Sequence, residues 1–206
     1  SDAQYRFMTT ANCVGKTVRS SEFQNAKTKG IIGIKLNDGD KLISAIPTSG
    51  DTEVMLITRR GKALRIKENS VRYMGRVSTG IKGMKLLEGD EIAAAVKVDT
   101  EKAIILLTEK GVGKRISPEY FSVHGRGTAG QRIFGNTDGK GEIIGAINAK
   151  ENDEVVCMTS QGKTLRFKAS EIKEQGQSAS GVKIVTIKEP DYLVGIDVVQ
   201  DKDEEN

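Results

Sequence analysis

Residues 54–67 read VMLITRRGKALRIK, and their pattern predicts the fold of the chain. An apolar run that ends at Thr58 is followed by a turn, where Gly61 can adopt a positive φ, and then by alternating apolar and basic residues. Residues 80–86 alternate again, residues 88–90 form a second turn, and residues 92–98 are more apolar. The stretch therefore predicts a unit of about four short antiparallel strands.

The same unit recurs along the whole chain of 206 residues. Similar apolar runs end in threonines that are spaced by 48, 50 and 51 residues, and glycines further along each unit are spaced by 50, 50 and 51. These markers are Thr10, Thr58, Thr108 and Thr159, with Gly30, Gly80, Gly130 and Gly181. Two independent markers with one period predict four tandem copies.

The period divides the chain into a single repeat domain over residues 1–200 and an acidic tail over residues 201–206. The copies are expected at approximately 4–50, 51–100, 101–151 and 152–200. Units of this size cannot bury their apolar faces alone, so neighbouring copies must pack together. We therefore predict an all-β, propeller-like fold of four four-stranded antiparallel blades. The sequence leaves open whether the blades form a closed ring or an open arc.

The composition narrows the class of protein and its compartment. Gly is abundant at 23 residues and Pro is rare at 3, which suits short strands joined by glycine turns. Two cysteines, Cys13 and Cys157, are too few for a disulfide framework, so we expect a reducing cytosol. No apolar run is long enough for a membrane span and no signal peptide opens the sequence, so no membrane contact is expected. Residues 1–4 lead almost at once into a strand-like segment, which suggests a fragment of a longer protein.

Charge is distributed unevenly along the chain and within each copy. The net charge is +4 and the last six residues carry −3, so the remaining 200 residues carry +7. Residues 59–85 hold nine Lys or Arg and one acid, whereas residues 86–109 hold six acids and two lysines. Residues 109–135 and 138–158 repeat this trend more weakly. Each copy thus has a basic half, formed by its second and third strands with their loops, and an acidic half.

Stacked copies would collect the basic halves on one surface, which suits the phosphate backbone of DNA because Lys and Arg release counterions there. Such contacts position DNA without reading its sequence, and a curved row of them favours bent or wrapped DNA. The alternative is that these cations only keep solvent-facing strands and edges soluble. The predicted DNA contacts are Lys16, Arg19, Lys62, Arg65, Lys67, Arg72, Arg76, Lys82, Lys85, Lys114, Arg115, Arg126, Arg132, Lys163, Arg166 and Lys168.

Several stretches resemble the C-terminal domain of the DNA gyrase A protein. Residues 54–67, 70–76 and 80–86, with 89–90, look like one of its blades. The other blades are matched by residues 22–25 with 30–34 and 38–40, residues 107–115 with 119–120, and residues 159–162 with 170–172 and 180–182. The resemblance covers essentially the whole chain. It implies a β-pinwheel, a propeller relative whose blades exchange strands, and these four blades look like the last four of the six that are usual in the family.

The resemblance also implies a role. The family domain is a non-catalytic DNA-binding module that wraps or bends DNA and contributes to supercoiling by an ATP-dependent type II topoisomerase. The implied partners are double-stranded DNA, bound without sequence preference, and the remainder of the gyrase A protein together with the gyrase B protein, with no cofactor. The implied location is the bacterial cytoplasm, at the nucleoid. Tyr5, Tyr73, Tyr120 and Tyr192 do not carry the DNA-cleaving tyrosine motif of the family, so no catalytic residue is expected.

The chain departs from the family pattern in two places. The signature box, Gln-basic-Arg-Gly-Gly-basic-Gly, is absent, and residues 125–132 are basic and glycine-rich without matching it. Either the box belongs to a blade outside this sequence, or the chain resembles the corresponding domain of the topoisomerase IV A protein, which has fewer blades and a degenerate box. In the third copy, residues 136–141 replace the usual Gly-Asp turn, so the register of that copy stays open.

Two other classes of protein compete with this one. A propeller-type scaffold for protein interactions is compatible with the fold, because fold alone does not fix function. An enzyme is disfavoured, because His124 is the single histidine, no Cys or His cluster has metal-ligand spacing, and no Ser-His-acid arrangement is suggested. Residues 125–130 are glycine-rich but lack the Gly-Lys-Ser/Thr end of a phosphate-binding loop. No metal site is expected.

Overall fold

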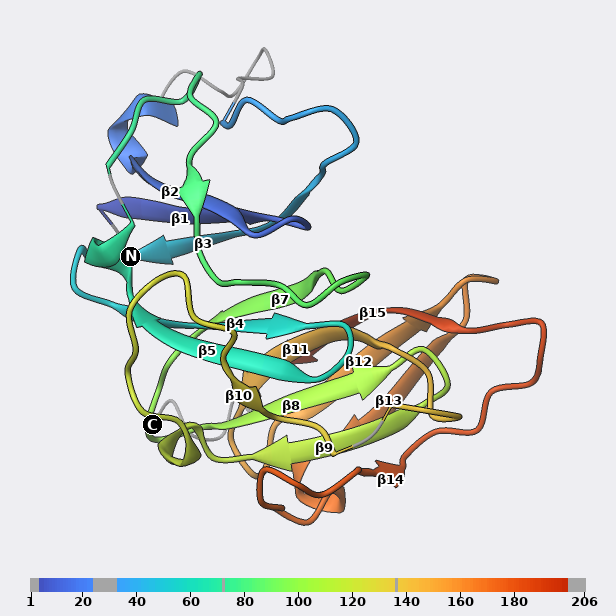
Figure 1. The fold of residues 1–206 in the computed structure, drawn as a ribbon. Coiled ribbons are helices and arrows are strands. Elements are labelled where there is room, and N and C mark those ends of the chain that lie inside the picture. Colours follow the sequence, from blue (N-terminus) through green and yellow to red (C-terminus); the bar gives the residue numbers. More distant parts are fainter. Residues whose placement is uncertain (1–3, 24–32, 72, 136, 200–206) are drawn as a thin grey trace. The chain divides into compact units, whose positions relative to one another are not determined.

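The computed structural model describes residues 4–23, 33–71, 73–135 and 137–199, and it is an all-β protein (Figure 1). Its strands are β1 (Tyr5–Thr10), β2 (Val14–Arg19), β3 (Leu42–Thr48), β4 (Glu53–Thr58), β5 (Lys62–Lys67), β6 (Ile81–Lys82), β7 (Ile92–Lys97), β8 (Ala103–Thr108), β9 (Val112–Ile116), β10 (Gln131–Arg132), β11 (Ile143–Ala149), β12 (Glu154–Thr159), β13 (Thr164–Lys168), β14 (Val182–Lys183) and β15 (Leu193–Val199). Short 3-10 turns follow the second strand of each copy: η1 (Ser20–Phe23), η2 (Glu68–Ser70), η3 (Pro118–Tyr120) and η4 (Ala169–Glu171).

The strands form one sheet for each copy. The first three sheets run β3-β1-β2-β6, β10-β5-β4-β7 and β11-β8-β9-β14, and the last runs β13-β12-β15. In the first three sheets, one edge strand is a two-residue segment from the following copy, namely β6, β10 or β14. We call these three segments the exchange strands. The predicted all-β fold of four blades is confirmed, with the strand exchange that the family resemblance implied. The fourth sheet has three strands among the described residues.

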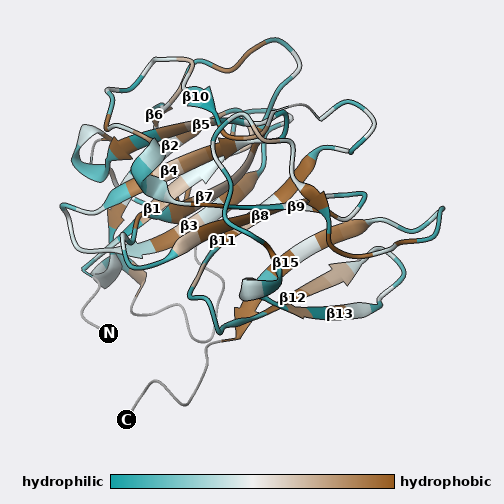
Figure 2. Ribbon diagram, turned by 90° about the horizontal axis from the view of Figure 1, so that it is seen from below, coloured by the Kyte–Doolittle hydropathy of each residue, from teal (hydrophilic) through white to brown (hydrophobic). Residues whose placement is uncertain are grey.

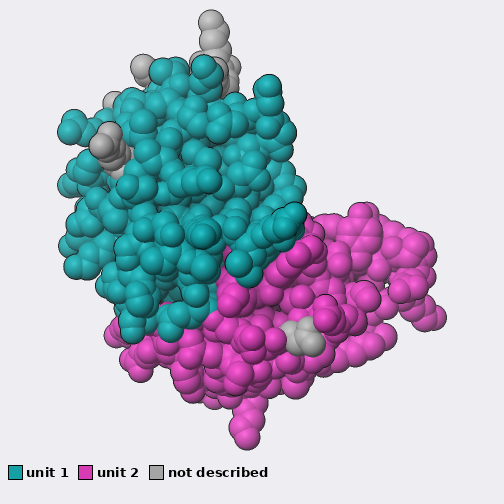
Figure 3. All heavy atoms as spheres, viewed as in Figure 1, with its two compact units in different colours: residues 1–57, 63–97, 122–131 teal, residues 58–62, 98–121, 132–206 magenta. Residues whose placement is uncertain are grey.

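The chain divides into two compact units (Figure 3). Unit 1 comprises residues 1–57, 63–97 and 122–131, and unit 2 comprises residues 58–62, 98–121 and 132–206. Unit 1 contains the first two sheets apart from residues 58, 62 and 132, and unit 2 contains the third and fourth sheets. The single domain expected over residues 1–200 stays a prediction, and so does the choice between a ring and an arc.

Each unit has an apolar core between its two sheets. In unit 1, Phe7 of the first sheet packs in one cluster with Leu56 and Leu64 of the second. In unit 2, Ile105 of the third sheet packs with Val155 of the fourth. In Figure 2, hydrophobic residues are concentrated in the strands, while the connecting loops are mainly hydrophilic. Pairs of neighbouring blades therefore bury the apolar faces that a single copy would expose.

The repeated threonines stabilise the first hairpin of each copy. Each hydroxyl is buried and accepts a hydrogen bond from the backbone amide four residues later, over 3.0–3.2 Å. The third residue after each threonine has a positive φ, which is 97° at Gly61 and 60° at Cys13 of the first copy. The positive φ predicted for Gly61 is confirmed, and the threonine period marks the turn that every copy must make.

The repeated glycines allow the exchange strands to approach the preceding copy. Gly80, Gly130 and Gly181 all have positive φ values, which glycine tolerates best. A Cβ atom at each position would lie 2.5–2.6 Å from a backbone oxygen, which belongs to Gly15, Ala63 or Gly113. A larger residue would therefore displace the exchange strand. Gly30, the first marker of this series, lies outside the described residues.

The third copy keeps the common register despite its unusual turn. The amide of Lys140 donates to the carbonyl oxygen of Thr137 over 3.0 Å, and the Thr108 hydroxyl donates to the Lys140 carbonyl over 2.6 Å. The register shift between Ile143 and Gly145 matches shifts at the same place in the first and fourth copies. Over residues 137–141, the part of the departure that the structure describes, the change is thus absorbed within the turn itself.

Candidate nucleic-acid interface

Each exchange strand follows a loop that encloses one residue of the preceding copy. We call residues 73–80, 123–130 and 174–181 the first, second and third exchange loops. They begin at parallel bridges, which join Thr17 to Tyr73, Arg65 to Val123 and Arg115 to Glu174. The first and third loops return antiparallel, where Gly15 pairs with Ile81 and Gly113 pairs with Val182. The residues enclosed by the three loops are Lys16, Leu64 and Lys114.

Lys16 lies at the centre of the first exchange loop. Its side chain is fully buried, and Nζ donates hydrogen bonds of 2.8 Å to the carbonyl oxygens of Gly75, Arg76 and Ser78. Desolvation lowers the pKa of Lys16 to about 8, with a smaller raising effect from the charge of Glu22 and a lowering effect from Arg76. The three carbonyls satisfy the three donors of the ammonium group, which is why the cation can be buried.

Lys114 has a similar arrangement, with two of its three acceptors in the third exchange loop. Its fully buried Nζ donates to the carbonyl oxygens of Ile133, Gln177 and Ala179 over 2.7–2.9 Å. Lys16 and Lys114 were both predicted to contact DNA. Their burial corrects that prediction, because an ammonium group that is enclosed by backbone carbonyls cannot reach a phosphate.

The depressed pKa of Lys114 predicts how stability depends on pH. Desolvation lowers that pKa from 10.5 to about 8 in the folded protein, so the unfolded chain binds more protons between these values. The free energy of unfolding should therefore rise with pH in this window, by up to about 1.4 kcal/mol per pH unit from this one group. We expect the difference between the wild type and Lys114→Leu, measured by urea unfolding, to grow in favour of the wild type from pH 8 to pH 10.5. A difference that is constant across the window would contradict the burial of a charged lysine.

The second exchange loop gathers exposed cations in unit 1. Arg126 Nη1 donates to the carbonyl oxygen of Lys82 over 2.9 Å, and the Lys85 amide donates to the Thr128 carbonyl over 2.8 Å. The Gly127 amide also donates to the carbonyl oxygen of Gly83 over 2.7 Å. The side chains of Lys82, Lys85 and Arg126 are all exposed, and we call this set the basic edge of unit 1. It joins residues of the second and third copies that lie more than forty positions apart in the sequence.

The other predicted cations of unit 1 differ in accessibility. Arg19 and Lys67 are exposed at the ends of β2 and β5, and Arg76 is half-buried in the first exchange loop. Arg65 binds Glu53, with Nη2 and Nε at 2.5 and 2.9 Å from the same carboxylate oxygen, so its charge is already matched within the sheet. Arg72 lies outside the described residues.

In unit 2 the predicted cations are placed on several elements. Arg132, Lys163 and Lys168 are exposed, and Lys62 is half-buried. The exposed Arg166 lies 3.5 Å from Glu154. Arg115 is half-buried and donates to the carbonyl oxygen of Ile172 over 3.2 Å. The structure therefore brings fewer of these residues together than the repeat suggested.

The predicted DNA contacts left out the exposed cation of the exchange strand β14. Lys183 on β14 pairs with Val112, as Lys82 on β6 pairs with Val14. Lys82, Arg132 and Lys183 each stand two residues after a repeated glycine, and all three are exposed. The spacing of those glycines was the signal that could have identified Lys183 from the sequence.

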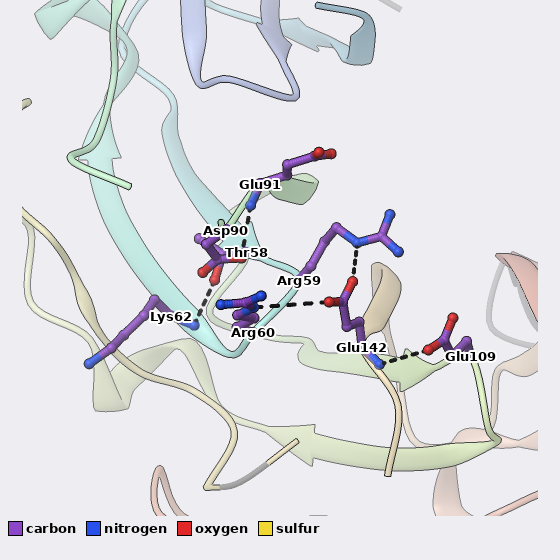
Figure 4. Close-up of polar contacts among 8 residues, drawn as sticks. All are labelled: Thr58, Arg59, Arg60, Lys62, Asp90, Glu91, Glu109 and Glu142. Atoms are coloured by element: carbon purple, nitrogen blue, oxygen red, sulfur yellow. Dashed lines mark hydrogen bonds and ion pairs between the residues drawn. The ribbon is translucent and has the colours of Figure 1, made fainter. Parts of the chain in front are cut away.

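Acidic residues of the second, third and fourth copies make contacts in the turns, and Figure 4 shows those of the second and third. Asp90 accepts a hydrogen bond from the amide of Glu91 over 2.8 Å, and Asp191 accepts from the Ser160 hydroxyl over 2.6 Å. Glu142 forms an ion pair with Arg59 at 2.7 Å, and its amide lies 3.4 Å from a carboxylate oxygen of Glu109. These acids therefore have structural roles, whereas the exposed cations Lys82, Arg132 and Lys183 lie on the exchange strands.

Other kinds of site find little support in the described part of the chain. No group of three His, Cys, Asp or Glu side chains there could hold a metal ion. Within the same ranges, none of the helices has the length and apolar character to cross a membrane. His124 is exposed in the second exchange loop, where its amide donates to the carbonyl oxygen of Arg65 over 2.9 Å.

Comparison with known families matches the chain four times, at residues 7–49, 52–99, 102–150 and 153–200, to the DNA gyrase C-terminal domain, a β-propeller. The chain belongs to this gyrase family. Each matched segment coincides with one predicted copy, so the fifty-residue period is the period of the gyrase blade.

The gyrase relatives include the DNA gyrase A protein of Treponema pallidum (strain Nichols), 56% identical over 199 residues, and that of Escherichia coli (strain K12), 36% identical over 201 residues. Both comparisons cover 97% of this chain but 24% and 23% of those relatives, so the chain spans about a quarter of their length.

Two solved structures share the gyrase blade arrangement. A DNA gyrase A C-terminal domain matches with a TM-score of 0.87 at 31% identity, covering 95% of this chain and 66% of that one. The C-terminal domain of DNA topoisomerase IV matches with a TM-score of 0.86, covering 96% of this chain and 62% of that one. Its identity is 23%, which shows the fold alone.

Proposed function

We propose that this gyrase-family domain binds double-stranded DNA through its phosphates, without sequence preference, and bends or wraps it. The observation that carries the proposal is the exposed cation on every exchange strand, Lys82, Arg132 and Lys183. Regularly repeated cations suit a partner with regularly repeated phosphates, and phosphate contacts carry no sequence information. The basic edge of unit 1 adds Lys85 and Arg126 to the first of these positions.

The proposal extends to the setting of the domain. We infer that it is a non-catalytic part of a gyrase A protein, that it acts with a gyrase B protein in the bacterial cytoplasm, and that it contributes DNA wrapping to supercoiling. The support is the family match and the relatives, which are gyrase A proteins. The topoisomerase IV alternative has weaker support, because that structure shares the fold at 23% identity.

Binding should weaken steeply with salt. Fluorescence anisotropy on end-labelled duplexes of unrelated sequence should give similar affinities at low salt, with log K falling linearly against log salt by about 0.9 per phosphate contact. Energy transfer between dyes at the two DNA ends should rise on binding if the duplex bends. The absence of duplex binding at low salt would overturn the proposal. A strong preference for one sequence would show that binding does not depend on phosphate contacts alone.

Charge reversal of the basic edge should reduce affinity for every duplex. For the double variant Lys82→Glu and Arg126→Glu, we expect affinity at low salt to fall by more than about tenfold and the salt slope to fall by about 2, since two phosphate contacts are lost. The matched control is Lys41→Glu with Lys97→Glu, which changes the net charge equally but at exposed residues directly before β3 and at the end of β7. Equal losses in the two double variants would mean that net charge, and not the basic edge, attracts DNA.

A further inference from the structure

All three exchange loops accept a backbone amide hydrogen bond at an equivalent carbonyl oxygen. They differ in whether they also accept hydrogen bonds from a lysine side chain. The carbonyl oxygens of Ser78, Thr128 and Ala179 occupy equivalent places, and each accepts an amide hydrogen bond over 2.8–3.0 Å. The donors are Lys35, Lys85 and Gly135. The first and third loops are also bound by a buried ammonium group, whereas the second loop encloses Leu64. The protein thus contains loops with and without an internal cation on the same scaffold.

The cation changes how closely the loop packs. In the second loop, residues 123–128 are all exposed. In the first loop, Met74, Arg76 and Ser78 are half-buried, and in the third loop residues 175–177 are half-buried. The loops that enclose a lysine are therefore held against the sheet, while the loop that encloses a leucine stands further into solvent.

The ends and the middle of the first loop are fixed by different groups. At its start the Met74 amide donates to the Thr17 carbonyl over 3.0 Å, and at its end Ile81 pairs with Gly15. In the middle, the carbonyl oxygens of Gly75 and Arg76 are both bound by Lys16. Arg76 is thus attached to the sheet through its own backbone by the Lys16 ammonium group.

We propose that Lys16 is a positioning residue, whose buried charge holds the first exchange loop so that Arg76 is placed for contact with a DNA phosphate. This inference rests on the proposed DNA binding. Lys16 itself touches no DNA. Lys114 holds the third loop through the carbonyl oxygens of Gln177 and Ala179, but residues 174–181 contain no Lys or Arg, so its loss loosens a loop that carries no cation of its own.

The test compares Lys16→Leu with Lys114→Leu. Leucine is chosen because Leu64 and Leu165 occupy the equivalent positions in the second and fourth copies, so the fold accommodates it. Amide hydrogen exchange should accelerate by about tenfold or more in the loop beside each substitution, because local opening becomes easier. Lys16→Leu should weaken DNA binding by about tenfold, as expected for one lost charged contact, while Lys114→Leu should change it by less than about twofold.

A double-mutant cycle separates positioning from general destabilisation. If Lys16 acts through Arg76, adding Lys16→Leu to Arg76→Ala should cause no further loss of DNA affinity. Independent, additive losses would overturn the proposal, and so would equal losses in Lys16→Leu and Lys114→Leu. Unchanged exchange in the first loop of Lys16→Leu would also overturn it.

Two further outcomes are also decisive. If Lys16→Leu does not fold, ¹⁵N NMR of the wild type still tests the premise, because the Lys16 ammonium protons should exchange with water far more slowly than those of surface lysines. Exchange as fast as at the surface would overturn the proposal. If the wild type binds no DNA, the proposed function fails, and the exchange measurements then decide separately whether Lys16 orders the loop.

Discussion

Gly80→Ala is expected to destabilise unit 1 by about 3–5 kcal/mol, because the added methyl group meets backbone that cannot move independently. A Cβ atom at Gly80 would lie 2.5 Å from the carbonyl oxygen of Gly15, and the residue has a φ of 111°. The exchange strand β6 would have to leave β2 to relieve this contact, which also breaks the pairing of Ile81 with Gly15. Urea unfolding of the whole chain, followed by circular dichroism, measures the loss.

The matched control is Gly39→Ala. Gly39 also has a positive φ, of 77°, but a Cβ atom there would meet nothing within 4 Å. This variant should lose only the cost of a left-handed alanine, about 1–2 kcal/mol. Equal losses at the two positions would show that backbone conformation, rather than the close approach of the exchange strand, explains the repeated glycine.

The same substitution should affect DNA binding through the position of Lys82. Lys82 is the second residue of β6 and pairs with Val14, so a detached exchange strand no longer fixes the Lys82 backbone, whose carbonyl oxygen accepts a hydrogen bond from Arg126. Under conditions where Gly80→Ala remains folded, its DNA affinity should fall towards that of the basic-edge variant, while Gly39→Ala should bind as the wild type does. This comparison links the packing requirement of the repeat to its proposed function.

The sequence predicts the repeat well because both of its markers have local physical causes. Thr58 is needed where its hydroxyl stabilises the hairpin turn, and Gly80 where the backbone of another copy approaches. The alternation in residues 62–67 likewise reports which side of β5 is buried, since Leu64 and Ile66 are buried while Lys67 is exposed. Each of these features can be recognised without knowing how the copies are arranged.

The candidate site was harder to predict, because accessibility depends on contacts between copies. Lys16 and Lys82 are both lysines in strand-like segments, yet one is buried by the loop of the next copy and the other lies on the exchange strand. When the copies are aligned, Lys16 occupies the position of Leu64. A cation at a position that is apolar in another copy was therefore the available sign of burial. Arg65 gave no such sign, because its ion pair with Glu53 depends on the register of β4 and β5.

Glu68→Ala should destabilise unit 1 by about 3–5 kcal/mol, the second large effect that we expect. The Glu68 carboxylate is fully buried beneath the turn that precedes β4. It accepts hydrogen bonds from the Thr48 hydroxyl at 2.5 Å and from the amides of Gly50 and Thr52 at 2.6 and 2.8 Å. Alanine removes every acceptor at once, so the donors must be satisfied by water or remain unpaired. A loss below about 1 kcal/mol in urea unfolding would show that water replaces the carboxylate at little cost.

The fourth copy shows how the same turn is built without that carboxylate. Ala169 takes the place of Glu68, because its amide donates to the Asp153 carbonyl over 2.9 Å, as the Glu68 amide donates to the Thr52 carbonyl. There an Asp153 carboxylate oxygen accepts from the Lys150 amide over 2.8 Å, a role that the Thr52 hydroxyl fills for Ser49 over 3.1 Å.

Thr52→Asp should therefore have opposite effects in two backgrounds. In Glu68→Ala it transfers the arrangement of the fourth copy and should restore about 1 kcal/mol of unfolding free energy, the usual worth of one or two hydrogen bonds. In the wild type it places a second carboxylate beside buried Glu68, and the repulsion of like charges should lower the unfolding free energy. Urea unfolding of the four chains in this cycle gives both signs. If Thr52→Asp has the same sign in both backgrounds, the two turns are not interchangeable solutions to one problem, and the buried carboxylate has a role that the fourth copy does not share.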